Sequence, residues 1–299
     1  MSADYVSGFV ALIGRPNTGK STLLNRLVGQ KVSITSRRPQ TTRHRILGIK
    51  TGEREQVVYV DTPGLHASEG NMMSRYLNRA ASGSLEGVDC ILLLITAGGW
   101  QEQDEPALMH ARRQTCPVIL VINKIDKLKD HAKLLPLIEG SREKMTFAEI
   151  IPLSAHTGAG VDDLEHTIRR YLPMHPPYFP AEQLSDRSDR FMAAELIREQ
   201  IFRLLGKEVP YATAVEIQEF KHEPKLIRIE ATIWVEKDGQ KAIVIGNKGE
   251  RMKEIGRNAR LAMQTAFGSK VYLGLWVKVR AGWSDDARVL RSLGYGDDT

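Results

Sequence analysis

A short glycine-rich segment near the start of the chain has the residue types and the spacing of a phosphate-binding loop. Residues 14–21 read GRPNTGKS and fit the pattern G-x-x-x-x-G-K-[ST]. Its glycines let backbone N–H groups close around phosphate oxygens, while Lys20 can reach the β- and γ-phosphates and Ser21 can ligate Mg²⁺. We predict a nucleoside triphosphate site formed by Gly14, Arg15, Pro16, Asn17, Thr18, Gly19, Lys20, Ser21 and Thr22.

Three more motifs could complete that site. DTPG supplies an aspartate that can hold a metal ion through water and a glycine N–H that can reach the γ-phosphate. NKID supplies a carboxylate that can accept the ring N–H and the exocyclic amine of guanine, a pattern that adenine does not present. SAH offers backbone groups that can close over the base. These motifs contribute Asp61, Thr62, Pro63, Gly64, Asn123, Lys124, Asp126, Ser154, Ala155 and His156.

Each motif is expected to follow a buried β-strand. Runs of aliphatic and β-branched residues lie at 9–13, 57–60, 90–95, 118–122 and 150–153, between amphipathic helical stretches at 20–28, 72–82, 105–113 and 161–171. This alternation predicts an α/β fold with a parallel sheet covered on both faces, and residues 45–51 predict one antiparallel edge strand. The four motifs would then meet at the carboxyl edge of a doubly wound sheet, where such sheets bind ligands.

The pattern changes after residue 172. Residues 173–190 contain Pro173, Pro176, Pro177 and Pro180 and predict a semi-extended linker. A helix at 191–205, strands at 214–220, 226–235 and 241–245, a helix at 250–266 and a strand at 271–279 give the order α-β-β-(β)-α-β. We predict two domains, 1–172 and 191–299, the second an α+β layer with helices on one face of a three-stranded sheet.

A second candidate site lies in the later domain. Ile245, Gly246, Asn247, Lys248 and Gly249 form a G-x-x-G loop, which we expect between a strand and a basic helix. In K-homology domains, such glycines let an RNA backbone come close and the helix start receives phosphate, clamping about four nucleotides. Further RNA contacts are expected from Arg251, Met252, Ile255 and Gly256, although positions 252, 255, 259, 263 and 266 also form a stripe suited to the core.

Charge and composition support two phosphate-facing sites. The 299 residues carry a formal net charge of +6, with six basic and no acidic residues in 31–50 and nine basic against two acidic residues in 241–280. Two cysteines are too few for a disulfide framework or a zinc cluster, and no export leader or membrane-spanning run is evident. We expect a protein of the reducing cytoplasm.

The quoted motifs resemble those of the translation-factor-related GTPases, and within them the Era family of bacterial ribosome-associated GTPases. The similarity covers nearly the whole chain and includes PQTTR at 39–43 and SAHTGAG at 154–160. It implies a Mg²⁺-dependent GTPase domain joined to a type II K-homology domain. It also implies that Thr41 or Thr42, of which we favour Thr42, reaches Mg²⁺ and the γ-phosphate when GTP binds, with Lys20, Thr42 and Gly64 as catalytic residues.

The resemblance further implies partners and regulation. Residues 31–50 become the first switch segment, and the second begins at 65–71. The RNA is expected to be the 3′ end of small-subunit 16S ribosomal RNA, the role to lie in 30S subunit assembly, and the protein to associate peripherally with the inner membrane. Apart from the resemblance, we expect a monomer.

One position departs from better-known small GTPases. Leu65 stands where those proteins carry a glutamine that orients the attacking water, so intrinsic hydrolysis is expected to be slow. The GTPases that this sequence resembles suggest that a partner or K⁺ completes the hydrolytic site, with Asn17 as a K⁺ ligand. Two alternatives stay open: a peripheral membrane or cell-cycle switch, and a GTP-dependent tRNA-modifying factor.

Overall fold

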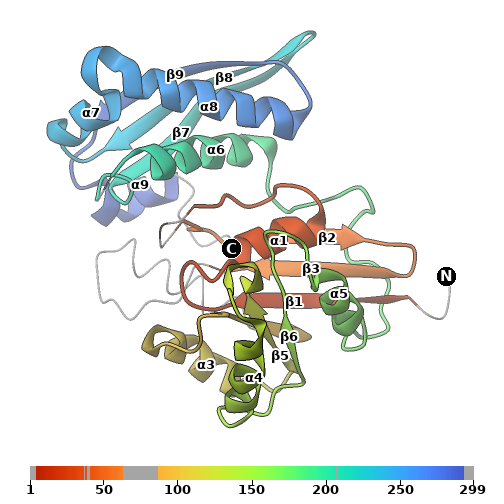
Figure 1. Cartoon of the computed structure of the whole chain (residues 1–299). Coiled ribbons are helices and arrows are strands. Elements are labelled where there is room, and N and C mark those ends of the chain that lie inside the picture. The colour runs from red at the N-terminus through yellow and green to blue at the C-terminus, as the bar shows by residue number, and fades with distance from the viewer. Residues whose placement is uncertain (1–4, 37, 39–40, 63–86, 207, 293–299) are drawn as a thin grey trace. The chain divides into compact units, whose positions relative to one another are not determined.

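The computed structural model describes residues 5–36, 38, 41–62, 87–206 and 208–292, and its contacts divide the chain into two compact units (Figure 1). The first unit takes in the described residues up to Ser33 and from Thr42 to Asp186. The second takes in Ile34–Thr41 and the described residues from Arg187 onward. The predicted helix at 72–82 lies outside the described residues.

A six-stranded sheet forms the centre of the first unit. Its strands are β1 (Val6–Ile13), β2 (Ile46–Thr51), β3 (Glu55–Asp61), β4 (Cys90–Thr96), β5 (Val118–Asn123) and β6 (Glu149–Pro152). They lie in the order β2-β3-β1-β4-β5-β6, and every neighbouring pair is parallel except β2 with β3. The predicted mostly parallel sheet with one antiparallel edge strand is confirmed.

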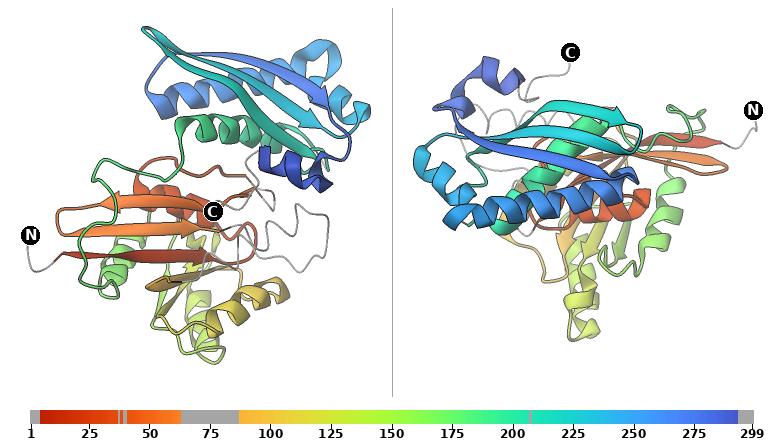
Figure 2. Two further views of the ribbon diagram at one scale, coloured as in Figure 1. Left: turned by 180° about the vertical axis from the view of Figure 1, so that it is seen from behind. Right: turned by 90° about the horizontal axis from the view of Figure 1, so that it is seen from above.

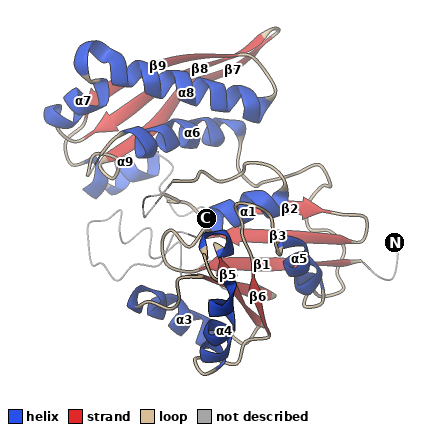
Figure 3. Ribbon diagram, in the orientation of Figure 1, coloured by secondary structure: helices blue, strands red, loops and turns tan. Residues whose placement is uncertain are grey.

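Helices cover both faces of this sheet (Figure 3). Helices α1 (Lys20–Val28) and α5 (Val161–Arg169) share one apolar cluster with the sheet, and α3 (Glu105–Arg112) and α4 (Leu134–Arg142) pack on a second. Along β1, Val10 and Leu12 face the first cluster while Ala11 and Ile13 face the second. Because strands covered on both sides bury every side chain, β4 is an uninterrupted apolar run up to its last residue.

The proline-rich stretch is bound to the first unit along much of its length. Ser7 N donates to Pro173 O at 3.1 Å, and Ile49 N donates to Leu184 O at 2.8 Å. The buried Gln56 amide accepts from Tyr178 N at 2.7 Å and from Phe179 N at 2.9 Å. The first unit therefore extends to Asp186, beyond the end at residue 172 that we expected.

The second unit is built on a three-stranded sheet. Its main elements are α6 (Asp189–Leu204), β7 (Thr213–Glu223), β8 (Leu226–Val235), α7 (Asp238–Ile245), α8 (Glu250–Phe267), β9 (Val271–Val279) and α9 (Ala287–Ser292). Strands β7 and β8 are antiparallel, and β8 and β9 are parallel. Helices α6 and α8 lie on one face of this sheet and share its core (Figure 2). Short 3₁₀ helices lie at Glu102–Asp104, Ile125–Lys127, His131–Lys133, Asn247–Gly249 and Trp283–Asp285.

The strand predicted at 241–245 is wrong, because these residues form the end of helix α7. Gln240 Oε1 accepts from the backbone N–H groups of Glu236 at 2.9 Å and Lys237 at 3.1 Å, which fixes a helix start. A short apolar run such as AIVI does not by itself distinguish a strand from a buried helix segment. The order is therefore α-β-β-α-α-β, and the G-x-x-G loop joins two helices.

Candidate functional site

The loop between β1 and α1 has the backbone shape of a phosphate cradle. Gly14 and Gly19 have φ angles of +148° and +104°, and Asn17 has a φ of +64°. An added Cβ atom would lie 2.5 Å from Leu94 O at Gly14 and 2.3 Å from Asn123 Nδ2 at Gly19, so both positions require glycine. Helix α1 begins after Gly19 without a side-chain cap, which suits its first N–H groups to an anion.

Lys20 is buried within this loop. Its Nζ donates to Gly14 O at 2.8 Å and to Arg15 O at 3.1 Å. Burial lowers the pKa of Lys20 to about 8, although Asp61 acts in the opposite direction. A phosphate anion beside the amine would favour its charged form. Arg15 is already paired, since its Nε lies 3.0 Å from Asp104 Oδ1.

Hydroxyl and carboxylate oxygens meet where β3 ends. Ser21 Oγ donates to Asp61 Oδ2 at 2.8 Å and lies 2.9 Å from Thr42 Oγ1. Ser33 Oγ donates to the same carboxylate oxygen at 2.9 Å. Asp61 Oδ1 is buried and has no hydrogen-bond partner, and burial raises the pKa of Asp61 more than Lys20 and the hydroxyls lower it.

This donor set fits Mg²⁺. The ion prefers hard oxygen ligands and usually takes one or two protein groups together with water and substrate phosphates. Ser21 and Thr42 offer hydroxyl oxygens, and the buried Asp61 Oδ1 can accept from a metal-bound water. No group of three or more His, Cys, Asp or Glu side chains within the described ranges offers another metal centre.

The adjacent residues Thr41 and Thr42 make different contacts. Thr41 Oγ1 donates to Arg38 O at 2.8 Å and lies 2.6 Å from Ser36 Oγ, within its own segment. Thr42 Oγ1 instead lies with Ser21 and, at 3.5 Å, with the Asp61 carboxylate. The geometry therefore favours Thr42 as the metal ligand.

Asn123 ties the phosphate loop to the carboxyl ends of β5 and β6. The residue is buried, and its Nδ2 donates to Thr18 O at 2.8 Å. Its Oδ1 accepts from Lys124 N at 2.7 Å and from Ala155 N at 2.9 Å. One amide thus holds together three of the four predicted motifs.

The predicted base-binding carboxylate is fixed but exposed. Asp126 Oδ1 accepts from Ser154 Oγ at 2.5 Å, and the residue is open to solvent. Lys124 Nζ donates to Asn17 O in the phosphate loop. Arg26 Nη2 donates to His156 O at 2.6 Å, which holds the SAH motif against α1. This arrangement can offer guanine an oriented acceptor at the end of β5.

The remaining predicted positions divide into two groups. Thr62 is buried and donates to Leu12 O at 3.0 Å, while Pro16 and Thr22 are partly exposed. Predictions for Pro63, Gly64 and the segment 65–71 lie outside the described residues, as do positions 39 and 40 of PQTTR.

The G-x-x-G loop of the second unit has a left-handed backbone. Gly246, Lys248 and Gly249 have φ angles of +73°, +50° and +79°. A Cβ atom at Gly246 would lie 2.7 Å from Arg251 Cβ, so this glycine permits the close turn into α8. Asn247 and Lys248 are exposed at its tip, and α8 begins without a side-chain cap. The loop can therefore present N–H groups and a cation to a phosphate.

The predicted contacts on α8 separate by burial. Arg251 is exposed, and Met252 and Gly256 are partly exposed. Ile255 is fully buried in the apolar core with Ala259 and Met263, so we assign its side chain to packing.

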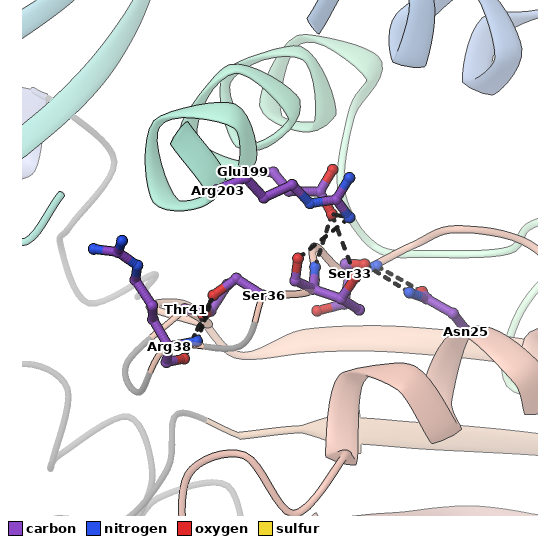
Figure 4. Close-up of polar contacts among 8 residues, drawn as sticks. Asn25, Ser33, Ser36, Arg38, Thr41, Glu199 and Arg203 are labelled. Atoms are coloured by element: carbon purple, nitrogen blue, oxygen red, sulfur yellow. Dashed lines mark hydrogen bonds and ion pairs between the residues drawn. The ribbon is translucent and has the colours of Figure 1, made fainter. Parts of the chain in front are cut away.

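Sequence reasoning missed Asn25 and Ser33. Asn25 Oδ1 accepts from Ser33 N at 2.9 Å, and its Nδ2 donates to Ser33 O at 2.7 Å (Figure 4). Its Oδ1 also accepts from Val32 N at 2.8 Å. Asn25 lies one helical turn beyond Ser21, on the same side of α1. This spacing is the one sequence signal that could have identified Asn25. Helix α1 thereby holds Ser33 where it reaches Asp61.

Comparisons with known proteins cover both units. Residues 9–124 match the family described as 50S ribosome-binding GTPase, and residues 208–284 match the KH domain family. GTPase Era of Coxiella burnetii (strain Dugway 5J108-111) is 56% identical over 288 residues, which are 96% of this chain and 97% of that protein. GTPase Era of Pseudomonas aeruginosa (strain LESB58) is 52% identical over 290 residues, which are 97% and 95% of the two chains.

Two solved structures match over nearly the whole chain. Era in complex with MgGDPNP and nucleotides 1506–1542 of 16S ribosomal RNA has a TM-score of 0.94 and 41% identity, covering 98% of this chain and 99% of that chain. A variant of Aquifex aeolicus Era bound to GDP·AlF4⁻ also has a TM-score of 0.94 and 41% identity, covering 97% and 99%. Similarity at this level across both units shows that the chain belongs to the Era family of GTPases.

Proposed function

We propose that this chain is a GTP-hydrolysing switch that binds the 3′ end of 16S ribosomal RNA and acts in 30S subunit assembly. The observation that carries the proposal is the meeting of Ser21, Thr42 and Asp61 beside a phosphate cradle, in a chain that also carries a G-x-x-G loop. The related structure holding GDPNP and 16S ribosomal RNA supports this pairing of ligands.

Hydrolysis is the attack of water on the γ-phosphorus, with GDP leaving. Bound Mg²⁺ would supply charge neutralisation at the phosphate oxygens. Lys20 holds the β- and γ-phosphates, and its burial strengthens its attraction for charge that develops in the transition state. The Thr42 hydroxyl would ligate the ion, and the Asp61 carboxylate would accept from a water molecule bound to it. Asp126 selects guanine by accepting from its ring N–H and its exocyclic amine.

No side chain at the position after Gly64 can orient the attacking water. Leu65 offers no polar group to a water molecule, so we infer a slow intrinsic rate. Asn17 is exposed in the phosphate loop, where its side-chain oxygen is available to a K⁺ ion that would add positive charge beside the phosphates. This potassium dependence is a prediction that a comparison of salts can test.

RNA binding is assigned to the loop at Gly246–Gly249 and the start of α8. Gly246 and Gly249 permit close backbone approach, and Lys248 and Arg251 supply exposed cations. The proposal places the chain with ribosomal RNA in the cytoplasm. No helix in the described part of the chain is long and apolar enough to cross a membrane, and peripheral association with the inner membrane stays a prediction.

The test is binding of a labelled RNA from the 3′ end of 16S ribosomal RNA, followed by fluorescence anisotropy at fixed salt. Wild type should bind, and Lys248→Glu should weaken binding about tenfold or more, because one phosphate contact is replaced by repulsion. Lys225→Glu, an equal charge change at an exposed turn between β7 and β8, is the matched control and should weaken it less.

The alternatives are outcomes of the same assay. Equal affinity for transfer RNA would favour the hypothesis of a tRNA-modifying factor. Displacement of the RNA by vesicles rich in anionic lipid would favour the hypothesis of a membrane switch. Absence of RNA binding, or identical binding by Lys248→Glu and wild type, would reject the assigned site.

A further inference from the structure

Helix α6 of the second unit carries two charged pairs, each with at least one buried side chain. Arg198 bonds to both carboxylate oxygens of Glu195 at 2.7 Å, and Arg203 lies 2.9 Å from Glu199. The side chains of Arg198 and Glu199 are 1% and 0% exposed. Burying charges costs free energy unless hydrogen bonds compensate, so the groups that cover these side chains matter.

The segment Ile34–Thr41 covers part of these charged side chains of α6. Its described residues are 34–36, 38 and 41. Although it lies between Ser33 and Thr42 in the sequence, its contacts place it in the second unit. Ile34 is fully buried in the apolar cluster that contains Leu196 and Ile197 of α6. The segment is therefore anchored in the core of the second unit.

Both ends of the segment are bound by neighbouring residues of α6. Glu199 Oε1 accepts from Thr35 N at 3.0 Å and lies 3.4 Å from Thr35 Oγ1. Arg198 Nη2 donates to Thr41 O. In both bonds one partner is a charged group, and such hydrogen bonds are stronger than those between two neutral groups.

Hydrogen bonds within the segment join its two ends. Ser36 Oγ lies 2.6 Å from Thr41 Oγ1 and accepts from Arg38 N at 3.0 Å, while Thr41 Oγ1 donates to Arg38 O at 2.8 Å (Figure 4). A displacement at one end is therefore passed to the other.

The segment is continuous with the nucleotide site at both of its ends, since Ile34 follows Ser33 and Thr41 precedes Thr42. Ser33, beside Ile34, and Thr42, beside Thr41, both bond to the Asp61 carboxylate. Because consecutive Cα atoms are about 3.8 Å apart, Thr42 cannot stay at Asp61 if Thr41 moves away by more than a few ångströms.

We propose that Glu199 and Arg198 are positioning residues for GTP hydrolysis, which hold the first switch segment from the second unit so that Thr42 stands at the metal site. The inference rests on the proposed function and assigns part of the hydrolytic apparatus to the RNA-binding unit. GDP binding depends on the phosphate cradle and the base site, so it does not require this positioning. Coupling is reciprocal, so binding at the nucleotide site also biases the contacts of α6.

The test separates positioning from general stability through kcat and GDP affinity. Glu199→Ala should lower kcat for GTP about tenfold, the effect of losing a hydrogen bond to a charged group, while the dissociation constant for GDP stays within about twofold. Glu199→Gln keeps an acceptor oxygen for Thr35 N and should restore much of kcat. The matched control is Glu216→Ala, which removes a carboxylate that accepts from Trp234 Nε1 at 2.7 Å in the sheet of the same unit. It should leave kcat unchanged.

A second variant tests the other end of the segment. Arg198→Lys keeps a positive charge beside Glu195 but shortens its reach to Thr41 O, and it should lower kcat in the same sense. If these variants keep the wild-type melting curve and the wild-type kcat, the positioning role is rejected. A wild-type chain that fails to hydrolyse GTP would instead reject the proposed function, and with it this inference.

Discussion

Replacing Gly19 by alanine tests whether the phosphate cradle and the base site are one structure. The new Cβ atom would lie 2.3 Å from Asn123 Nδ2, and Gly19 has a φ of +104°. The backbone conformation costs alanine roughly 1–2 kcal/mol. Moving Asn123 breaks its bonds to Thr18, Lys124 and Ala155, each worth about 1 kcal/mol net. The combined penalty is about 4–5 kcal/mol, of which we expect at least half to fall on nucleotide binding.

Calorimetric titration with GDP and Mg²⁺ measures this effect. A loss of about 3 kcal/mol corresponds to a dissociation constant weakened about 100-fold. The matched control is Gly29→Ala at the end of α1, where φ is +81° but no atom lies within 4 Å of the new Cβ. It should lower the melting temperature while leaving GDP affinity within about twofold. If Gly19→Ala binds GDP as tightly as wild type, or Gly29→Ala loses as much affinity, the reasoning is refuted.

Further predictions concern base selection, the cation and the second unit. Asp126→Asn should weaken GTP binding about 100-fold and gain affinity for xanthosine triphosphate, because an amide donor replaces an acceptor; unchanged selectivity in competition titrations would contradict this. K⁺ should accelerate phosphate release relative to Na⁺ in wild type but not in Asn17→Ala, and equal rates in both salts would remove the potassium site. Gly274→Ala would place a Cβ atom 1.7 Å from Glu230 Oε2 and 3.0 Å from Trp276. We expect the free energy of unfolding, measured by thermal denaturation, to fall by about 1–3 kcal/mol while GTP affinity is retained. An unchanged melting temperature would contradict this packing.

Strand-end motifs were the most predictable part of the site. Asp61 and Asn123 end β3 and β5, and Ser154 follows β6 closely, so parallel pairing alone brings them to one edge. Apolar runs covered on both faces identify such strands from sequence because their composition is nearly uniform. The antiparallel edge strand was predictable because the turn at Gly52 leaves no room for a crossover helix between β2 and β3, whereas the order of the strands was not predicted.

Contacts between residues distant in sequence were not predictable in the same way. Ser33 reaches Asp61 across 28 positions, and Glu199 reaches Thr35 across 164, with no spacing rule to indicate either pair. The apolar run AIVI at 242–245 is too short to show a decisive period, so the sequence does not distinguish a strand from a helix there. The Gln240 contact that begins α7 becomes evident only in three dimensions. Helix α4 was not predicted.

The most direct test of the central claim is the affinity for the 3′ end of 16S ribosomal RNA, measured by anisotropy at one salt concentration with saturating GDP and then with a non-hydrolysable GTP analogue. A switch whose nucleotide and RNA sites are coupled predicts affinities that differ by about 5-fold or more, with the GTP analogue giving the tighter complex. Equal affinities in the two nucleotide states would contradict the account.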